Sequence, residues 1–363
     1  MSKPLVSGVQ SEVRLPQANH SLGVPQVSVI TPTRSRTRLL AEAIESVREQ
    51  TLDSWEHLIV DDGPDEETAR LVEDRANLDR RVRYLARQGP VAGANVCRNL
   101  GLAEARGRFV VFLDDDDRLA PECLAQRVAV MRQNLDLDFA VFAAEIFEEQ
   151  PGDLGLPYQN LDAADDLLRF LSLDCPWQTT GPIWRRAYLL ALGGFTADLL
   201  SMQDLELHVR ALCARPSYLV RQTADHFIRA VHDASRTSTR HFHDPVFIDR
   251  SESIPGLLAR HVERAGLSSW SRCRALLGLR FGTAERWAAA GDPAAAFRSW
   301  RKACRETNAS PLVSLPGYAM LCLAGFDPQR RGLAARIVNK WKGAVRFRQE
   351  PALSPPRDDG HCG

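Results

Sequence analysis

The sequence lacks a strong net charge, a cysteine framework and a long apolar run. Lys and Arg together number 46, as do Asp and Glu, so the basic excess typical of a nucleic-acid-binding domain is missing. The eight cysteines include no C-x-x-C pair, which is typical of free thiols in a reducing compartment. No uninterrupted apolar segment reaches the roughly 18 residues of a membrane span, and the polar N-terminus is unlike a signal peptide. We therefore expect a cytoplasmic protein that has no nucleic-acid partner.

Segments typical of strands alternate with segments typical of helices from Val27 to Phe147. Most of the strands are apolar on both faces, which favours an α/β fold with a mostly parallel sheet covered by helices on both sides. Ligands in such folds bind at the carboxyl ends of the strands. The predicted strands are 27–31, 55–62, 82–86, 108–114 and 138–147, and the predicted helices are 39–50, 65–75, 94–105 and 121–134.

The composition shifts towards Ala, Arg, Leu and Trp beyond Ile248, which indicates a helical extension over 248–348. Within it, 278–307 is typical of two antiparallel helices, similar to one tetratricopeptide hairpin. The main domain is then 26–247, and 1–25 and 349–363 are expected to be disordered tails. The basic segment 329–348 is expected to be a solvated helical face, with peripheral contact to an anionic membrane as the alternative.

Four consecutive aspartates, Asp114 to Asp117, follow the apolar segment RFVVFL at a predicted strand end. Their mutual repulsion requires a nearby cation, and carboxylates in a partly open site suit Mg²⁺ or Mn²⁺. The alternative is an Asp-rich loop in which one carboxylate, that of Asp117, caps the helix near Pro121. Because one cap needs only one aspartate, we favour the metal interpretation.

Several blocks of the sequence, taken in order, resemble the inverting, GT-A-type family 2 glycosyltransferases. These blocks are VITPTRSRTRLLAEAIESVREQT, WEHLIVDDG, CRNLGLAEARGRFVVFLDDDDRLAP, TTGPIWRRAYLLALGGF and SMQDLELHVRAL. The resemblance extends from Val27 to Ser238. It implies a GT-A fold, a nucleotide-sugar donor, most commonly a UDP-sugar, and a glycan or lipid-linked acceptor in surface-polysaccharide assembly.

The resemblance also assigns roles in donor binding. The second Asp of the VDDG block, Asp62, is expected to hydrogen-bond the base of the nucleotide, since a carboxylate accepts well from amide-type donors. Arg98 of the RNLG block is expected near the nucleotide. The metal-binding Asp-x-Asp motif of the family matches Asp114, Asp115 and Asp116, with Asp116 as metal ligand and Asp114 or Asp115 towards the ribose.

The first block departs from the family pattern. Family members usually have Pro-Thr-Tyr-Asn-Arg, and this chain has Pro32, Thr33, Arg34, Ser35 and Arg36. The block is still expected to contact the nucleotide sugar through Pro32, Thr33 and Arg34. Loss of the tyrosine removes a stacking surface for the base, and Arg34 could stack or contact phosphate in its place. The identity of the base therefore stays open.

Inverting transfer needs a carboxylate base for the acceptor hydroxyl and a cation for the leaving diphosphate. The family places its base at the Asp of a Glu-Asp pair after a Gly-Gly-Phe turn. This chain has Gln203 and Asp204 there, so Asp204 is the predicted base. The neutral Gln203 removes a like-charged neighbour, which favours ionisation of Asp204. The alternative is that Asp204 is only an acid in the first turn of a helix.

Two further residues are candidates for the site. His232, in a segment that resembles the family's closing loop, is a candidate metal ligand, with a plain surface position as the alternative. Trp177 is a candidate acceptor platform, because sugars pack on indole rings, with a core position as the alternative. Other interpretations of the whole chain are a nucleotidyltransferase, which the lack of a glycine-rich loop disfavours, and a non-catalytic nucleotide- or glycan-binding protein.

Overall fold

The structure is a computed structural model that describes residues 23–161, 165–230, 244–307, 315, 317–319 and 321. His232 and the basic segment 329–348 lie outside the described residues, so their predicted roles stay predictions. None of the helices in the described part of the chain is long and apolar enough to cross a membrane.

The first half of the chain alternates between strands and helices as the sequence predicts. Each predicted element from 27 to 147 is present, and its ends differ from the predicted ones by three residues at most. The elements are β1 (Val27–Thr33), α1 (Thr37–Arg48), β2 (Trp55–Asp61), α2 (Glu66–Leu78), β3 (Val82–Ala86), α3 (Ala94–Glu104), β4 (Phe109–Phe112), α4 (Cys123–Gln133) and β6 (Phe139–Phe147), with an additional short strand β5 (Arg118–Leu119).

The second half completes the sheet and adds a layer of helices. Its elements are β7 (Leu156–Pro157), α5 (Asp166–Leu171), β8 (Pro182–Arg185), α6 (Arg186–Ala191), α7 (Gln203–Cys213), β9 (Tyr218–Arg229), α9 (Pro245–Ser251), α10 (Ile254–Arg264), α11 (Trp270–Ala289) and α12 (Pro293–Glu306). The last two form the predicted hairpin, although α11 begins eight residues before the predicted start at Gly278.

The strands of the described residues belong to one mixed sheet with the order β3-β2-β1-β4-β8-β6-β9-β5, and β7 pairs with β6. The strands β3, β2, β1 and β4 are parallel, as predicted for the first half. Beyond them, β8 runs antiparallel to both of its neighbours, and β5 is antiparallel to β9. The carboxyl ends of β1, β2 and β4 therefore meet at one edge, where the three predicted site segments lie.

Helices cover both faces of the sheet, and alternate side chains of the strands enter separate cores. On β1, Val27 and Val29 pack with α1 and α4, whereas Ile30 packs with α3 and α7. Gly101 lets α3 approach closely, because a Cβ at this position would lie 2.4 Å from Ile30 Cγ2. This close packing brings the start of α3 beside the carboxyl ends of β1 and β2.

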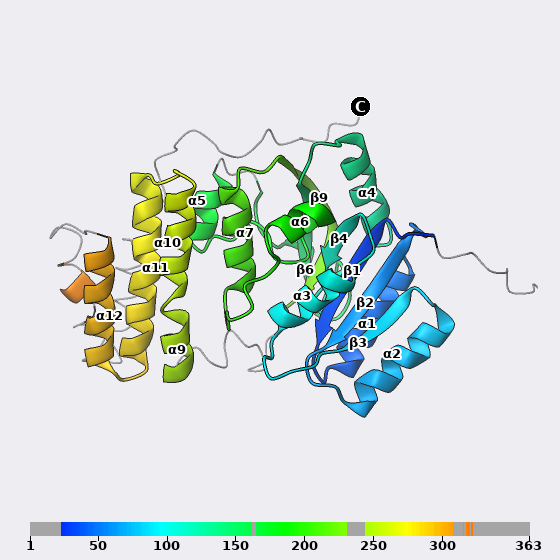
Figure 1. Cartoon of the computed structure of the whole chain (residues 1–363), viewed down its shortest axis with the longest axis horizontal. Coiled ribbons are helices and arrows are strands. Elements are labelled where there is room, and N and C mark those ends of the chain that lie inside the picture. The colour runs from blue at the N-terminus through cyan, green and yellow to red at the C-terminus, as the bar shows by residue number, and fades with distance from the viewer. Residues whose placement is uncertain are drawn as a thin grey trace, which may run out of the picture.

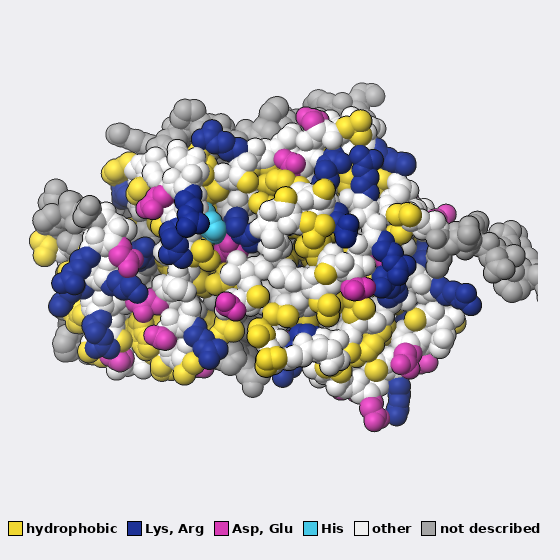
Figure 2. All heavy atoms as spheres, viewed as in Figure 1, with side chains coloured by type: hydrophobic (Ala, Val, Ile, Leu, Met, Phe, Trp, Pro, Cys, Tyr) yellow, Lys and Arg dark blue, Asp and Glu magenta, His cyan; other side chains and the backbone are white. Residues whose placement is uncertain are grey.

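The C-terminal helices continue the core of the sheet domain. Leu258 on α10 and Leu276 on α11 belong to the same buried cluster as Leu205 on α7, and α7 lies between the sheet and these helices (Figure 1). On the face of the molecule shown in Figure 2, Lys and Arg side chains lie over both the sheet and the C-terminal helices and do not form one patch. The predicted boundary near residue 248 thus falls inside a continuous core.

Candidate active site

The four aspartates point to different partners. Asp114 Oδ1 accepts a hydrogen bond from Arg98 Nη2 at 2.6 Å. Asp115 is buried, with Oδ2 accepting from Thr33 Oγ1 at 2.8 Å and Oδ1 accepting from Arg36 Nη1 at 3.2 Å. The strand end therefore holds these carboxylates with donors from β1, α3 and the turn before α1.

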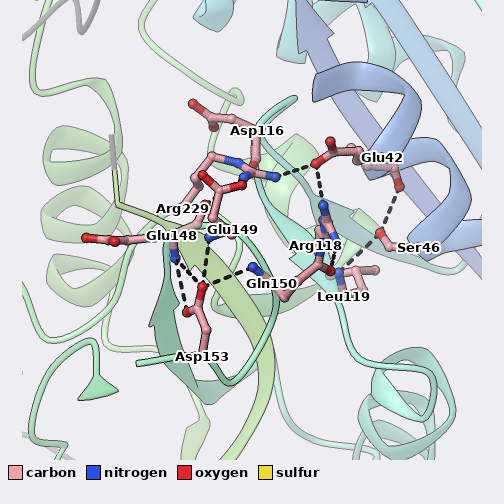
Figure 3. Close-up of polar contacts among 11 residues, drawn as sticks. Glu42, Ser46, Asp116, Arg118, Leu119, Glu148, Glu149, Gln150, Asp153 and Arg229 are labelled. Carbon is pink, nitrogen blue, oxygen red and sulfur yellow. Dashed lines mark hydrogen bonds and ion pairs between the residues drawn. The ribbon is translucent and has the colours of Figure 1, made fainter. Parts of the chain in front are cut away.

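Asp116 contacts a residue of the turn before α1, and Asp117 contacts a residue of β9. Arg36 Nη1 also donates to Asp116 Oδ2 at 3.0 Å. Asp117 is buried and accepts from the backbone N–H of Arg229 at 3.1 Å, so it does not cap α4. Arg229 Nε donates to the backbone oxygen of Asp116 at 3.2 Å, and its Nη2 reaches the carboxylate of Glu42, which Arg118 also contacts (Figure 3).

Arginine side chains thus neutralise part of the negative charge of the four aspartates, a role that the sequence analysis assigned to a metal ion. Arg36 lies between the carboxylates of Asp115 and Asp116, and Arg98 pairs with Asp114. Burial nevertheless raises the pKa of Asp115 to about 6, with the charge of Asp116 adding to the effect and Arg36 and Thr33 opposing it. Asp115 therefore holds a proton more readily than an exposed aspartate does, although Arg36 and Thr33 favour its ionised form.

Metal binding would use the two more exposed carboxylates. Asp114 and Asp116 have side chains that are 37% and 19% exposed, compared with 9% for Asp115. Mg²⁺ is usually held by one or two carboxylates together with substrate phosphates and water. Among the described residues there is no group of three or more His, Cys, Asp or Glu side chains that could hold a metal without substrate. Two carboxylates can hold such an ion only together with further ligands from a substrate or from water.

Asp62 lies at the carboxyl end of β2, directly beside β1. Its backbone N–H donates to the carbonyl of Thr33 at 2.9 Å. Its Oδ1 accepts from Arg87 Nε at 2.7 Å and from the N–H of Gly93 at 2.9 Å. Its Oδ2 lies 4.0 Å from Arg34 Nη1. One oxygen is thus used to position the carboxylate, and the other lies beside the exposed side chain of Arg34.

The two remaining residues of the first block differ in exposure. Pro32 is buried in β1, opposite Val60 on β2, so its contribution is to the shape of the strand end. Arg34 has a side chain that is 70% exposed, beside Asp62. The exposed guanidinium of Arg34 is accessible to a ligand. The buried side chain of Pro32 is not.

The helix that carries Arg98 also fixes the Gly-Gly-Phe turn. Asn99 Nδ2 donates to the carbonyl of Phe195 at 2.8 Å, and Asn99 Oδ1 accepts from the N–H of Phe195 at 2.8 Å. Gly194 has a φ of +66°, and a Cβ there would lie 2.5 Å from Asn99 Oδ1. The turn before α7 therefore requires glycine at this position and is held directly against α3.

Asp204 lies in the first turn of α7, directly after Gln203, which Arg98 contacts. This arginine is buried, pairs with Asp114, and also donates to Gln203 Oε1 at 3.4 Å. Burial raises the pKa of Asp204, while the N–H of Leu205 and the charge of Arg98 oppose the rise and the charge of Asp114 adds to it. The predicted base and the predicted metal motif thus share one electrostatic environment.

The indole of Trp177 is in the core. Its side chain is 2% exposed and packs edge-on against Phe170 at a centroid distance of 4.9 Å, and against His208 at 5.9 Å. This is the core position that the sequence left open as the alternative. In the structure neither indole face is available for stacking a sugar, and the acceptor role stays a prediction.

Several site residues were missed in the sequence. The side chains of Arg36 and Arg87 contact predicted carboxylates, and Arg229 contacts the carboxylate of Asp117 through its backbone N–H and the backbone oxygen of Asp116 through its side chain. Nothing in the local sequence of these arginines identifies those partners. Asn99 could have been found, because it belongs to the RNLG block from which only Arg98 was chosen.

The mixed sheet covered by helices on both faces is an α/β fold of the GT-A type. Solved structures of S. aureus TarS residues 1–349 show the same fold. The complex with UDP-GlcNAc matches with a TM-score of 0.54 and 18% identity, and covers 82% of this chain and 90% of TarS 1–349. The complex with UDP matches with a TM-score of 0.50 and 19% identity over the same shares.

Residues 28–175 match the family described as Glycosyl transferase family 2. The matched segment contains Asp62, Arg98 and the aspartate cluster but ends before Asp204.

Curated relatives match over the same region. The GalNAc(5)-diNAcBac-PP-undecaprenol beta-1,3-glucosyltransferase of Campylobacter jejuni is 34% identical over 36% of this chain and 41% of its own length. The putative glycosyltransferase EpsH of Bacillus subtilis is 31% identical over 38% of this chain and 40% of its own length. The putative teichuronic acid biosynthesis glycosyltransferase TuaG of Bacillus subtilis is 29% identical over 42% and 60%. The chain therefore spans less than two thirds of these relatives.

Proposed function

We propose that the chain is an inverting glycosyltransferase that moves a sugar from a nucleoside-diphosphate sugar to an acceptor hydroxyl. The observation that carries the proposal is the position of Arg98, which contacts both Asp114 and Gln203 and so joins the aspartate cluster to the helix of Asp204. A single displacement needs a leaving-group site and a base on opposite sides of one sugar, and this arrangement supplies a candidate for each.

In this reaction the oxygen of the acceptor hydroxyl forms a bond to the anomeric carbon, and the bond from that carbon to the diphosphate breaks. The hydroxyl proton passes to the carboxylate of Asp204, and the diphosphate leaves with the bonding electron pair. The raised pKa of Asp204 makes its carboxylate a stronger base than an exposed aspartate, and Arg98 still favours the ionised form.

The donor is proposed to be a UDP-sugar. Support comes from the carboxylate of Asp62, whose Oδ2 can accept from the N–H of a pyrimidine base, and from Arg34, which is exposed beside it. Asp116 and Asp114 would hold Mn²⁺ or Mg²⁺ together with the diphosphate, and such an ion stabilises the negative charge of the leaving group. Arg36 and Arg98 hold these carboxylates in place when no ion is bound.

The acceptor is proposed to be a glycan or a lipid-linked saccharide in surface-polysaccharide assembly. Two of the curated relatives are named for such products, an undecaprenol-linked saccharide and teichuronic acid. A cytoplasmic location fits this assignment. Contact of the chain with the inner face of the cell membrane is part of the same proposal, because a lipid-linked acceptor is presented there.

A donor screen with three variants tests the proposal. The protein with Mn²⁺ is expected to bind a nucleoside-diphosphate sugar, seen as a rise in melting temperature, and to release the nucleotide on turnover. Asp204→Asn is expected to bind the donor and to turn over about a hundredfold more slowly or worse. Asp116→Ala is expected to lose the Mn²⁺-dependent part of donor binding.

Asp198→Asn is the control, because Asp198 is an exposed carboxylate six residues before the proposed base. Full activity of Asp204→Asn would refute the assignment of the base. Donor binding with no turnover in the unchanged protein would favour the non-catalytic alternative. Failure of every donor to bind would refute the nucleotide-sugar proposal as a whole.

A further inference from the structure

Two polar side chains on α1 hold the segment that directly follows the four aspartates. Glu42 and Ser46 are four residues apart, so they lie on the same side of the helix. The carboxylate of Glu42 accepts from the side chain of Arg118, and Ser46 Oγ accepts from the backbone N–H of Leu119 at 3.2 Å. These two contacted residues form the short strand β5. The helix α1 therefore fixes the end of the aspartate cluster that leads into β5.

The carboxylate of Glu42 also reaches the last residue of β9. Its Oε2 atom accepts from the Nη2 atoms of both Arg118 and Arg229 (Figure 3). Both guanidinium groups lie over the ring of Phe147, with Cζ atoms 5.4 and 4.5 Å from the ring centroid. Two cations at this separation repel each other unless an anion lies between them. The carboxylate of Glu42 is that anion, and without its charge the two arginines are expected to move apart.

Arg229 connects Glu42 to the aspartate cluster. Its Nε atom donates to the backbone oxygen of Asp116 at 3.2 Å, and its Nη1 atom donates to the backbone oxygen of Glu148 at 2.8 Å. Its backbone N–H donates to Asp117 Oδ1 at 3.1 Å. Each nitrogen atom of the guanidinium group thus has an acceptor, and Glu42 is the acceptor that carries a charge. Loss of that charge would therefore disturb the contact with Asp116.

The aspartate cluster is itself a tight turn. The backbone N–H of Asp117 donates to the carbonyl of Asp114 at 3.1 Å, so Asp115 and Asp116 are the central residues of the turn. The orientation of a side chain at the centre of a turn depends on the adjoining peptide planes. The hydrogen bond from Arg229 fixes the plane that contains the Asp116 carbonyl. Contacts of this kind, one step removed from the ion, orient the ligands of metal sites.

We propose that Glu42 is a positioning residue for this turn. Through Arg229 it holds Asp116 in the orientation in which its carboxylate binds a divalent ion together with the diphosphate of the donor. The inference deepens the proposed function and rests on it. The competing explanation is that Glu42 only stabilises the fold.

Glu45 provides a matched control on the same helix. Its carboxylate also pairs with two arginines, Arg48 on α1 and Arg75 on α2, at 2.6 Å each. Its side chain is 39% exposed, compared with 28% for Glu42. Glu45→Gln therefore makes the same chemical change as Glu42→Gln, but the partners of Glu45 belong to α1 and α2 and not to the segments that hold the aspartate turn.

The first measurement uses the full chain without metal. Amide hydrogen exchange in peptides that cover 114–119 is followed by mass spectrometry in the unchanged protein and in both variants. The N–H groups of Asp117 and Leu119 report on the turn, because they donate to Asp114 and Ser46. We expect faster exchange at 114–119 in Glu42→Gln than in the unchanged protein, and no change in Glu45→Gln.

The second measurement is a calorimetric titration of UDP with and without Mn²⁺, with GDP as a second nucleotide. Mn²⁺ is expected to tighten nucleotide binding by the unchanged protein. Glu42→Gln should reduce this gain about tenfold, as loss of a contact that orients a metal ligand does, and should leave binding without Mn²⁺ unchanged. Glu45→Gln should keep the full gain.

Melting temperatures show whether each variant is folded. If Glu42→Gln does not fold, Arg229→Met takes its place. This change removes the guanidinium group but keeps the backbone N–H that donates to Asp117. The same loss of the Mn²⁺-dependent gain is expected from it.

Three results would overturn the positioning role and leave the transferase proposal in place. The first is faster exchange at 114–119 with a full Mn²⁺-dependent gain, which would mean that Glu42 only supports the fold. The second is a reduced gain without faster exchange, which would exclude an effect through the backbone of the turn. The third is an equal effect of Glu42→Gln and Glu45→Gln.

A different result would refute the proposed function itself. If Mn²⁺ does not tighten the binding of either nucleotide to the unchanged protein, the metal-dependent part of the transferase proposal fails. The positioning role of Glu42 fails with it.

Discussion

Replacement of Glu206 by glutamine is expected to destabilise the protein strongly at neutral pH. Glu206 is fully buried on α7, two residues after Asp204, and it accepts from Thr196, Arg210 and His261. Thr196 belongs to the turn before α7 and His261 to α10, so one carboxylate joins three segments. Although burial opposes ionisation, these donors lower the pKa of Glu206 from 4.5 to about 2.

The size of the effect follows from this difference in pKa. Since the pKa of Glu206 is lower in the folded than in the unfolded protein, its stabilisation is complete above pH 4.5 and is lost as the pH falls towards 2. The difference corresponds to about 3 kcal/mol at pH 7 and about 2 kcal/mol at pH 3.5. Glutamine keeps the shape of the side chain but not its charge, so Glu206→Gln removes this contribution.

The effect is measured as the difference in free energy of unfolding between the unchanged protein and Glu206→Gln, from urea titrations at pH 7 and pH 3.5. The control is Glu263→Gln, which makes the same chemical change at an exposed position of α10 and should alter the free energy of unfolding by less than about 0.5 kcal/mol. The reasoning is refuted if Glu206→Gln costs less than about 1 kcal/mol at pH 7, or if its cost does not shrink on acidification.

Three further predictions concern the site. Gly194→Ala should lower the free energy of unfolding by about 1–3 kcal/mol in a urea titration, because the left-handed backbone and the contact with Asn99 both oppose a side chain. Arg36→Gln should cost about 1–2 kcal/mol without metal, since two carboxylates lose their counter-charge, and Mn²⁺ should raise the melting temperature of this variant more than that of the unchanged protein. The kcat/KM of the active enzyme should fall as the pH drops through a value above the ordinary aspartate pKa of about 3.9, because Asp204 acts as the carboxylate and its pKa is raised. An acid limb unchanged in Asp204→Asn would contradict this assignment.

The parallel half of the fold could be predicted from the sequence because its strands are continuous apolar segments between clear helices. The second half was harder. The strand β9 contains Arg221, Gln222 and Thr223, and its pairing with β6 is irregular near Phe142 and Ala143. Strand β8 has only four residues. Such segments have neither the length nor the apolar pattern that identifies a strand without its neighbours.

The candidate site could be located but not explained from the sequence. The position of the carboxylates at strand ends follows from the order of the elements, and the structure brings Asp62, the aspartate cluster and Asp204 to the same edge. The partners of the carboxylates depend on tertiary contacts between distant segments, as in the pairing of Arg36 with Asp116 over 80 positions. The local sequence pattern therefore identified carboxylates that need positively charged partners. Which arginines serve as those partners depends on the fold.

The burial of α7 has a consequence for any attempt to shorten the protein. Asp204 lies in the first turn of this helix, shortly after a glycine turn, and α10 packs against the helix on the side away from the sheet. A chain cut before residue 245 would expose that side and would leave the carboxylate of Glu206 without His261. The helical extension thus supports the helix that carries the proposed base. Fusing the extension to another sheet domain would transfer only half of one hydrophobic core.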